Sequence, residues 1–154
     1  MQLGTILKAD AVKSIASCTS KKRLFHDLGE LAETSYGLNA TDVIDALIDR
    51  EGLGPTGVGQ GIALPHARMA GAEGVFGLFL RLEKPLDFEA VDRQPVDLVF
   101  ALIAPEDAGV DHLKALALVS RTLRDKAVCN KLRANSAAAT LHTLLPELEA
   151  SQAA

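Results

Sequence analysis

The sequence predicts one layered α/β domain, because helical patterns and strand patterns follow one another along a chain of ordinary composition. Two amphipathic helical patterns occupy residues 21–36 and 40–51, and a glycine-rich segment, 52–61, follows them. Three strand candidates come next and alternate with further helices, which is typical of sheets covered by helices. The chain has 154 residues, a usual size for one domain, so we expect a single domain over residues 1–154 with a core of about 5–148.

The first two helices are predicted from their apolar spacing and their ends. Ser20 is placed to cap a helix that runs to Tyr36, and Gly37 follows as a stop. Asn39 or Thr41 is placed to cap the second, and Gly52 lies just past its end. The apolar residues that recur at helical spacing are Leu24, Phe25, Leu28, Leu31 and Ala32 in the first helix and Val43, Ile44, Leu47 and Ile48 in the second.

Three strands are predicted after the glycine-rich loop, over residues 61–64, 75–82 and 96–104. The third is apolar on both faces, as a central strand would be. Asp111 is placed to cap a helix that extends to about Arg133 with a break near Asp125, and Ser136 is placed to cap a last one. Pro146 is expected to kink or end that last helix, because proline lacks the backbone N–H that the helix needs.

Composition excludes several classes of function. Apolar residues make up 48% of the chain, charged residues 23%, and the formal net charge is −4, so nothing favours nucleic-acid binding. The longest apolar stretches are about half of what a membrane span requires, and no signal peptide is evident at the start. We therefore expect a cytoplasmic protein with no direct membrane insertion and with reduced thiols at Cys18 and Cys129.

His66 stands in an unusual segment, GVGQGIALPHAR, residues 57–68. Glycines at every second position permit positive φ or the close approach of another molecule. Pro65 fixes its own φ and holds Leu64 extended, so a histidine that leaves the end of this strand is held in one orientation. A turn histidine after a buried strand explains the local pattern equally well.

His112 is expected in the first turn of its helix, at the core-facing end of an apolar stripe. A core histidine with satisfied hydrogen bonds is the default interpretation. The functional alternative is a neutral imidazole, since the positive end of the helix dipole disfavours imidazolium, beside backbone N–H groups that suit an anion. His26 and His142 are both predicted to lie on solvated helix faces.

The sequence provides no well-supported motif for nucleotide binding, hydrolysis or metal binding. Residues 52–57, GLGPTG, match G-x-G-x-x-G but follow a helical pattern and contain a proline, so a dinucleotide site is rejected. The P-loop, zinc-protease and serine-hydrolase signatures are absent from the sequence. A metal on His66 and His112 has no third ligand at a recognisable spacing, so we predict neither a metal nor a cofactor.

Four segments in register carry a resemblance that covers nearly the whole chain: ALIDREGLGPT, GVGQGIALPHAR, KPLDFEAVDRQPVDLVFALIAP and DHLKALALVSRTLRD. The sequence resembles the IIA proteins of the phosphoenolpyruvate-dependent phosphotransferase system, in the fructose/mannitol/nitrogen-regulatory group. The start, LGTILKADAV, is most similar to the nitrogen-regulatory members. The resemblance implies a mixed β-sheet flanked by helices, the fold of the fructose/mannitol-type IIA domains.

The resemblance also implies a function and a site. His66 would accept a phosphoryl group through Nε2 from a histidine phosphocarrier protein, with His112 as its partner and Arg50 and Thr56 in the surroundings. Arg50 would pair with phosphoryl oxygens or orient the partner, or else be a solvated residue at a helix end. The glycines, Gly59 and Gly61 among them, would let the partner protein come close.

The sequence departs from the family pattern at one position, and two other functions compete with the regulatory one. Pro55 stands where the family commonly has serine, which puts a hydroxyl role there in doubt. In the regulatory hypothesis, the phosphorylation state controls targets such as transporters or sensor kinases. In the alternative hypothesis, the chain is a sugar-uptake IIA protein that passes phosphate to a transporter domain. A pure interaction module, with His66 unphosphorylated, is the hypothesis from another class.

Overall fold

The two longest strands come from the most apolar stretches of the chain and form the centre of the sheet. In a computed structural model that describes residues 1–153, β5 (Phe76–Leu86) and β6 (Val96–Pro105) pair antiparallel, with Phe79 opposite Phe100. The interior of β6 is buried on both faces apart from the partly exposed Asp97, as predicted. The predicted strand 75–82 is confirmed, but it begins at Phe76 and extends to Leu86.

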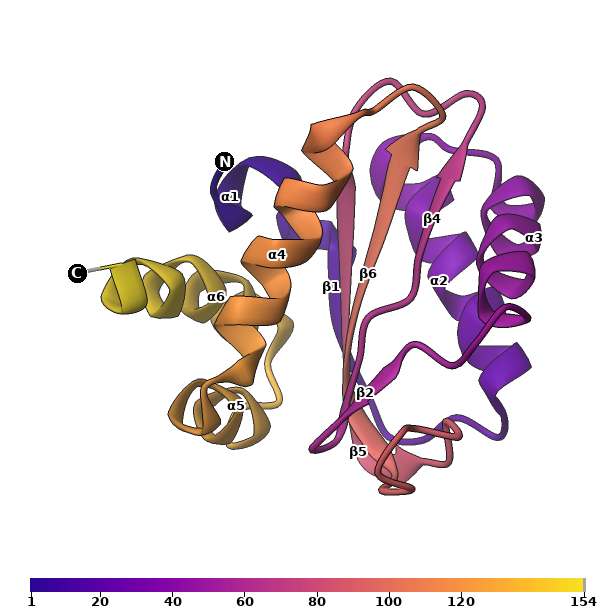
Figure 1. Cartoon of the computed structure of the whole chain (residues 1–154). Helices are drawn as coiled ribbons and strands as arrows, with labels where there is room; N and C mark the ends of the chain where they lie inside the picture. Colours follow the sequence, from indigo (N-terminus) through magenta and orange to yellow (C-terminus); the bar gives the residue numbers. More distant parts are fainter. Residues whose placement is uncertain (154) are drawn as a thin grey trace.

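The sheet has six strands of mixed direction (Figure 1). β1 (Val12–Ile15) forms one edge and pairs parallel with β5. On the other side of β6, β3 (Ile62–Ala63) and β4 (His66–Met69) both pair parallel with it, one after the other. β2 (Gly57–Gly59) adds an antiparallel hairpin arm to β3. The predicted mixed sheet flanked by helices is confirmed.

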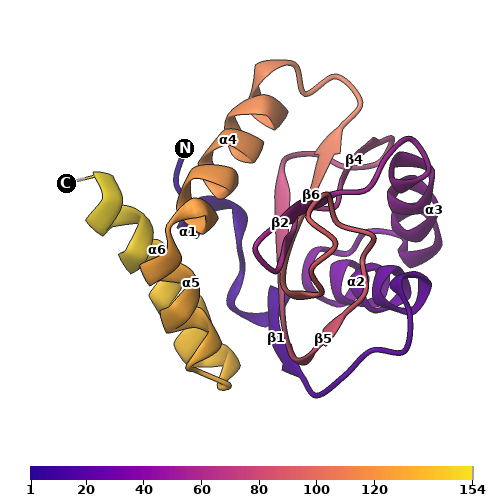
Figure 2. The ribbon, with the colours of Figure 1, turned by 60° about the horizontal axis from the view of Figure 1, so that its bottom comes forward.

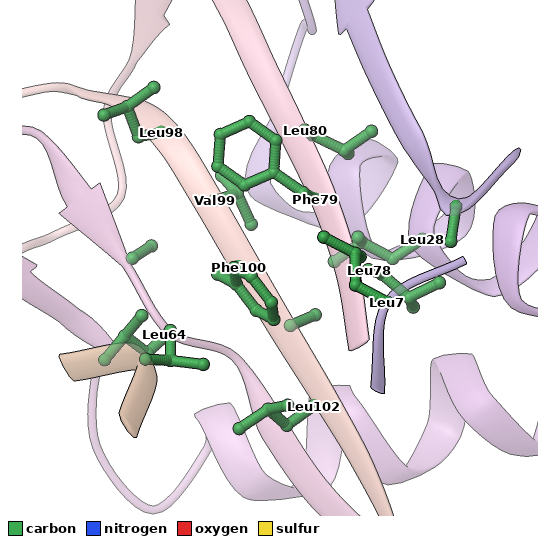
Figure 3. Packing of buried hydrophobic residues seen from close by; sticks show 14 of the residues in the cluster. Leu7, Leu28, Leu64, Leu78, Phe79, Leu80, Leu98, Val99, Phe100 and Leu102 are labelled. Atoms are coloured by element: carbon green, nitrogen blue, oxygen red, sulfur yellow. The ribbon is translucent and has the colours of Figure 1, made fainter. Parts of the chain in front are cut away.

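Helices cover both faces of this sheet, and the two views agree on how they divide (Figures 1 and 2). One face carries α2 (Lys21–Tyr36) and α3 (Ala40–Glu51). The other carries α4 (Val110–Arg124), α5 (Lys126–Arg133) and α6 (Ala138–Ala153). The core between the layers includes Phe79 and Phe100, whose ring centroids lie 6.0 Å apart (Figure 3).

The N-terminal helices begin and end where the sequence predicts. The Ser20 side chain accepts a hydrogen bond from the Arg23 N–H, and Gly37 takes the left-handed conformation after α2. Asn39, not Thr41, caps α3. Because a Cβ on Gly29 would stand 2.5 Å from Cγ1 of Ile44, glycine at this position lets α2 and α3 pack closely.

The C-terminal helices confirm one expectation and correct two. The break near Asp125 is confirmed, since Asp125 caps α5 with bonds from Ala127 and Val128. Asp111 does not cap α4, because the helix already starts at Val110: Gly109 is the cap residue, and Asp111 lies in the first turn. Ser136 stands two residues before the first residue of α6, so it is not the cap either.

Pro146 does not end α6, which continues to Ala153. Tertiary packing holds the helix beyond the missing N–H: Leu145 and Leu148 are buried, and Glu149 accepts a hydrogen bond from the Leu3 N–H at 2.8 Å. This contact joins α6 to α1 (Leu3–Ile6). The core contacts therefore outweigh the local helix-breaking preference of proline.

The sequence patterns missed five short elements: α1, the 3₁₀ helix η1 (Ala9–Ala11), β1, β2 and β4. Each has four residues or fewer, too short for a periodic signal to be distinguished from a loop. No helix in the described part of the chain is long and apolar enough to cross a membrane.

Candidate functional site

His66 begins β4 rather than leaving the end of the strand before it. β3 ends at Ala63, and Leu64 and Pro65 interrupt the pairing with β6, because Pro65 has no N–H to donate. The Pro65 carbonyl still accepts a hydrogen bond from Leu102 at 2.9 Å, so the interruption is held against β6. His66 is therefore fixed from both sides, by β3 before it and β4 after it.

The His66 ring is held in one tautomer. Its Nδ1 lies 2.8 Å from the carbonyl oxygen of Leu64, and since a carbonyl only accepts, Nδ1 carries the proton and donates. A neutral imidazole has one ring proton, so Nε2 keeps a free lone pair. The side chain is half-buried.

His112 projects from the first turn of α4 and is 5% exposed. Its Nδ1 lies 3.0 Å from Nε of Arg68, and a guanidinium only donates, so Nδ1 is the acceptor. The single ring proton then belongs to Nε2, which is buried and has no hydrogen-bond partner within the described residues. The interpretation of His112 as a satisfied core histidine is therefore wrong: half of its hydrogen-bonding capacity is unused.

The two rings lie next to each other, with centroids 5.5 Å apart and planes at 76°. Burial is the largest cause that lowers the pKa of each histidine below its usual value. The Leu64 carbonyl partly raises the pKa of His66 again. For His112, the neighbouring His66 and Arg68 lower the pKa further. Both rings are thus held neutral near pH 7, one with a free lone pair and one with a free N–H.

Arg50 folds back over the end of α3, where its Nη1 donates to the Gly54 carbonyl at 3.0 Å. The side chain is half-buried, and its charge lowers the pKa of His66. Arg50 is therefore held by the loop, and its charge acts on His66. A role of Arg50 towards a phosphoryl group stays a prediction.

Thr56 is buried and engaged within its own loop. Its hydroxyl donates to Oε1 of Glu51 at 2.5 Å, and its N–H donates to Oε2 of the same carboxylate at 2.9 Å. Lys21 lies 2.7 Å from that carboxylate and neutralises it. The carbonyl of Thr56 accepts from the Leu64 N–H at 2.9 Å, so Thr56 braces the residue whose own carbonyl holds His66.

Gly59 and Gly61 lie at the β2–β3 turn with φ of +103° and +81°. A Cβ on Gly61 would stand 2.6 Å from Nη2 of Arg133, and a Cβ on Gly59 would stand 3.2 Å from Oδ2 of Asp92. Groups of this chain therefore already require both glycines. Contact of Gly59 and Gly61 with a partner protein stays a prediction.

Most of the apolar residues near His66 in the sequence are buried, although Val58 is 52% exposed. Ile62, Ala63, Leu64 and Ala67 are all at most 7% exposed, because they face the core through the sheet. Exposed apolar side chains also lie next to His112 and Arg50 in the sequence, where Val110 is 61%, Leu113 62% and Leu53 85% exposed.

The other two histidines stay away from this pair. His142 is not on a solvated face: its Nε2 lies 3.1 Å from the Leu7 carbonyl, which ties α6 to the N-terminal segment. His26 is half-buried on α2. The structure also brings no group of three histidine, cysteine or acidic side chains of residues 1–153 within reach of one metal ion.

Sequence reasoning missed two residues of the site, Arg68 and Glu51. Arg68 lies two residues after His66, so on a strand both side chains point to the same face. That signal is invisible if the strand is taken to end before Pro65. Glu51 reads as an ordinary solvated residue at a helix end, and only the loop that returns over it shows its role.

A family model described as phosphoenolpyruvate-dependent sugar phosphotransferase system, EIIA 2, matches residues 5–147. The chain is similar to the "Nitrogen regulatory protein" of Bradyrhizobium diazoefficiens, with 44% identity over 145 residues, 94% of this chain and 95% of that protein. It is also similar to the protein of that name from Escherichia coli, with 39% identity over 150 residues, 97% of this chain and 92% of that one.

The fold is similar to the crystal structure of the nitrogen regulatory protein IIA-Ntr from Neisseria meningitidis. That comparison has a TM-score of 0.86 at 38% identity and covers 93% of this chain and 98% of the other. The similarity extends over the sheet and both helix layers rather than over one motif.

Proposed function

The chain belongs to the EIIA 2 family of the phosphoenolpyruvate-dependent sugar phosphotransferase system, and we propose that it is a regulatory member that accepts a phosphoryl group on His66. Proteins of this family are phosphoryl carriers, and its nitrogen regulatory relatives favour a regulatory role. The observation that carries the assignment to His66 is the pair of opposite tautomers: a free lone pair on His66 beside an N–H on His112 that has no partner among the described residues.

The donor is a phosphohistidine on a histidine phosphocarrier protein. The lone pair of His66 Nε2 forms the new N–P bond while the electron pair of the donor's N–P bond returns to the donor imidazole. Because phosphoryl transfer depends on alignment and charge stabilisation, the Leu64 carbonyl contributes by holding the nucleophile in place. His112 Nε2–H donates to a phosphoryl oxygen in the transition state.

Arg50 supplies positive charge beside the phosphoryl group. One of its donors holds the Gly54 carbonyl, and the remaining donors serve the phosphoryl oxygens or the partner protein. Thr56 acts indirectly, by bracing Leu64, while Gly59 and Gly61 belong to the hairpin that the partner approaches. The proposed source of the phosphoryl group, phosphoenolpyruvate, is a cytoplasmic metabolite, so the protein is proposed to act in the cytoplasm.

The test is phosphorylation followed by intact-mass measurement, with phosphoenolpyruvate and the two upstream carrier proteins. We expect one phosphoryl group per chain, labile in acid and stable in alkali, and none on His66→Ala. His26→Ala is the matched control, since His26 lies on α2 away from the pair, and it should label like wild type. Labelling that persists in His66→Ala would overturn the assignment, and no labelling of wild type would favour a pure interaction module.

The regulatory part of the proposal is that the unphosphorylated protein binds its target, a transporter or sensor kinase, through the surface around His66. Leu53, Val110 and Leu113 supply exposed apolar contact area beside the site. A phosphoryl group adds about −1.5 to −2 charges there, which must be desolvated on binding. Phosphorylation should therefore weaken the contact.

A pull-down with three forms of the protein tests this part. Wild type and His66→Ala should retain the target, and His66→Glu and enzymatically phosphorylated wild type should retain less. Equal recovery on all forms would favour the second candidate, a sugar-uptake component that passes phosphate to a transporter IIB domain. Transfer of label from His66 to such a domain would support that candidate directly.

A further inference from the structure

Arg68 is an exposed residue of β4 that reaches back to the histidine pair. Strand alternation places it on the same face as His66, while Ala67 and Met69 are buried on the opposite one. β4 is in turn fixed to β6 by parallel pairing from His66 to Met69. The arginine stem thus starts from a rigid element, and its guanidinium extends to the beginning of α4.

Two hydrogen bonds hold the guanidinium there. Its Nε donates to Nδ1 of His112 at 3.0 Å, and its Nη2 donates to the carbonyl of Gly109, the cap residue of α4, at 3.2 Å. The Gly109 carbonyl and the His112 ring belong to the same helix start. Bonds to both fix the arginine relative to the ring that it contacts.

We propose that Arg68 is a positioning residue for phosphoryl transfer: by donating to Nδ1 of His112, it keeps the ring proton on Nε2 and holds that N–H ready for a phosphoryl oxygen. This role rests on the function proposed above. In this role Arg68 binds His112 and does not bind the phosphoryl group itself.

Arg68 can select the tautomer of His112 because a neutral imidazole ring carries only one N–H proton. A neutral imidazole exists as an Nδ1–H or an Nε2–H tautomer, and an arginine donor at Nδ1 is compatible only with the second. Without Arg68 the ring would exchange between tautomers and would lose the bond that sets its orientation. Only the Nε2–H tautomer presents a donor from the buried atom that has no partner in the described residues.

The charges around His112 also keep its ring neutral. The groups that lower the pKa of His112, after its burial, are His66 and Arg68, both on β4, and α4 adds the positive end of its dipole at the first turn. Loss of the Arg68 charge should therefore raise the pKa of His112. A neutral His112 leaves His66 free to act, since an imidazolium beside it would donate strongly to the lone pair that must attack.

The first experiment observes His112 directly, by ¹⁵N NMR of the histidine rings in the unphosphorylated protein, with the His112 signals assigned by their loss in His112→Gln. Wild type should show the Nε2–H tautomer. Arg68→Met, which keeps the length of the stem, should show a tautomer mixture and a His112 pKa above that of wild type. Arg68→Lys should restore most of both properties, and Lys131→Met, the loss of an exposed cation on α5, should change neither.

The second experiment measures single-turnover phosphorylation of His66 by the phosphorylated carrier. The rate of phosphorylation should be about tenfold lower in Arg68→Met than in wild type. This decrease is smaller than the one expected when His112 itself is removed, because the donor ring is still present. Arg68→Lys should recover most of the rate. In a His112→Gln background, Arg68→Met should cause no further slowing, because the two residues act as one unit.

The outcomes separate the two proposals. A wild-type protein that takes no phosphoryl group overturns the proposed function and this role with it. Normal labelling of wild type, combined with an unchanged His112 tautomer in Arg68→Met, overturns the role of Arg68 alone. So does an equal slowing by Arg68→Met with and without His112, which would mean that Arg68 acts on the phosphoryl group independently.

Discussion

At the scale of single residues, the two histidines of the site receive opposite proton assignments from their neighbours. A carbonyl acceptor, that of Leu64, draws the proton to Nδ1 of His66, and a guanidinium donor, that of Arg68, pushes it to Nε2 of His112. A nucleophile needs the first arrangement and a hydrogen-bond donor to phosphate needs the second. The contact with a backbone carbonyl thus makes His66 suitable as the nucleophile, and the contact with an arginine makes His112 suitable as the donor.

Alanine substitutions at His112 and His142 should separate transfer from stability. His112→Ala should accept phosphate about 100-fold more slowly, because a preorganised donor is lost. His142→Ala should transfer normally but lose about 1 kcal/mol of unfolding free energy, because its bond to the Leu7 carbonyl is lost. Carrier-dependent labelling rates and urea unfolding measure the two effects. If both variants were slowed alike, the special role of His112 would be wrong.

Stability should fall as the pH is lowered through the range of the two site histidines. Burial lowers the pKa of His66 and of His112 in the folded protein, so the unfolded chain binds more protons below its histidine pKa of about 6.5. The unfolding free energy should therefore decrease from pH 7 to pH 5. Urea unfolding at several pH values measures this, and His66→Gln combined with His112→Gln should flatten the dependence. An unchanged slope in that double variant would contradict the assignment.

At the scale of elements, the β2–β3 hairpin links the site to the rest of the sheet. Its turn is crossed by Arg133 of α5, whose Nε donates to Asp97 at 2.8 Å and whose Nη2 donates to the Gln60 carbonyl at 2.8 Å. These contacts leave no room for a side chain at Gly61. The spaced glycines of this segment therefore reflect tight packing inside the protein.

Gly61→Ala should destabilise the protein more than Gly71→Ala does. Both glycines have a positive φ, +81° and +89°, so either substitution should cost about 1–2 kcal/mol in backbone strain. At Gly61 the new Cβ also meets Arg133 and Asp97, whereas at Gly71 no atom of the described residues would lie within 4 Å of it. Denaturant midpoints compare the two, and equal losses would show that the ion pair moves aside without cost.

At the scale of the whole molecule, one hydrophobic cluster extends from Leu3 of α1 to Leu148 of α6 and includes side chains of the sheet and of both helix layers. The site lies where these layers meet: His66 and Arg68 come from β4, His112 from α4 and Arg50 from α3. The distance between the two histidines therefore depends on how α4 packs on the sheet.

The described chain should unfold in a single cooperative transition, because that cluster leaves no separate core for an independent unit. Fluorescence of Tyr36, the only tyrosine in a chain without tryptophan, reports on a contact between layers, since its hydroxyl lies 2.7 Å from the Gly77 carbonyl. Its transition should coincide with that of far-ultraviolet circular dichroism. Two separated transitions would contradict the prediction of one domain over residues 1–154.

Much of the architecture was determined by the sequence itself. The caps at Ser20 and Asn39, the stop at Gly37 and the break at Asp125 lie in the chain where local hydrogen bonding requires them. The two long central strands follow from apolar runs too long and too continuous for a loop. The special backbone around His66 was also visible, because glycine and proline carry strong local preferences.

Only the tertiary structure decided what depends on contacts between distant segments. It continued α6 through Pro146, buried Ile62, Leu64 and Ala67 around His66, and left Val110 and Leu113 beside His112 exposed. It also brought Arg68 to His112 across 44 positions of the chain. Local sequence preferences act over a few residues, whereas the proton assignments of the two rings depend on which carbonyl and which guanidinium the packed layers place beside them.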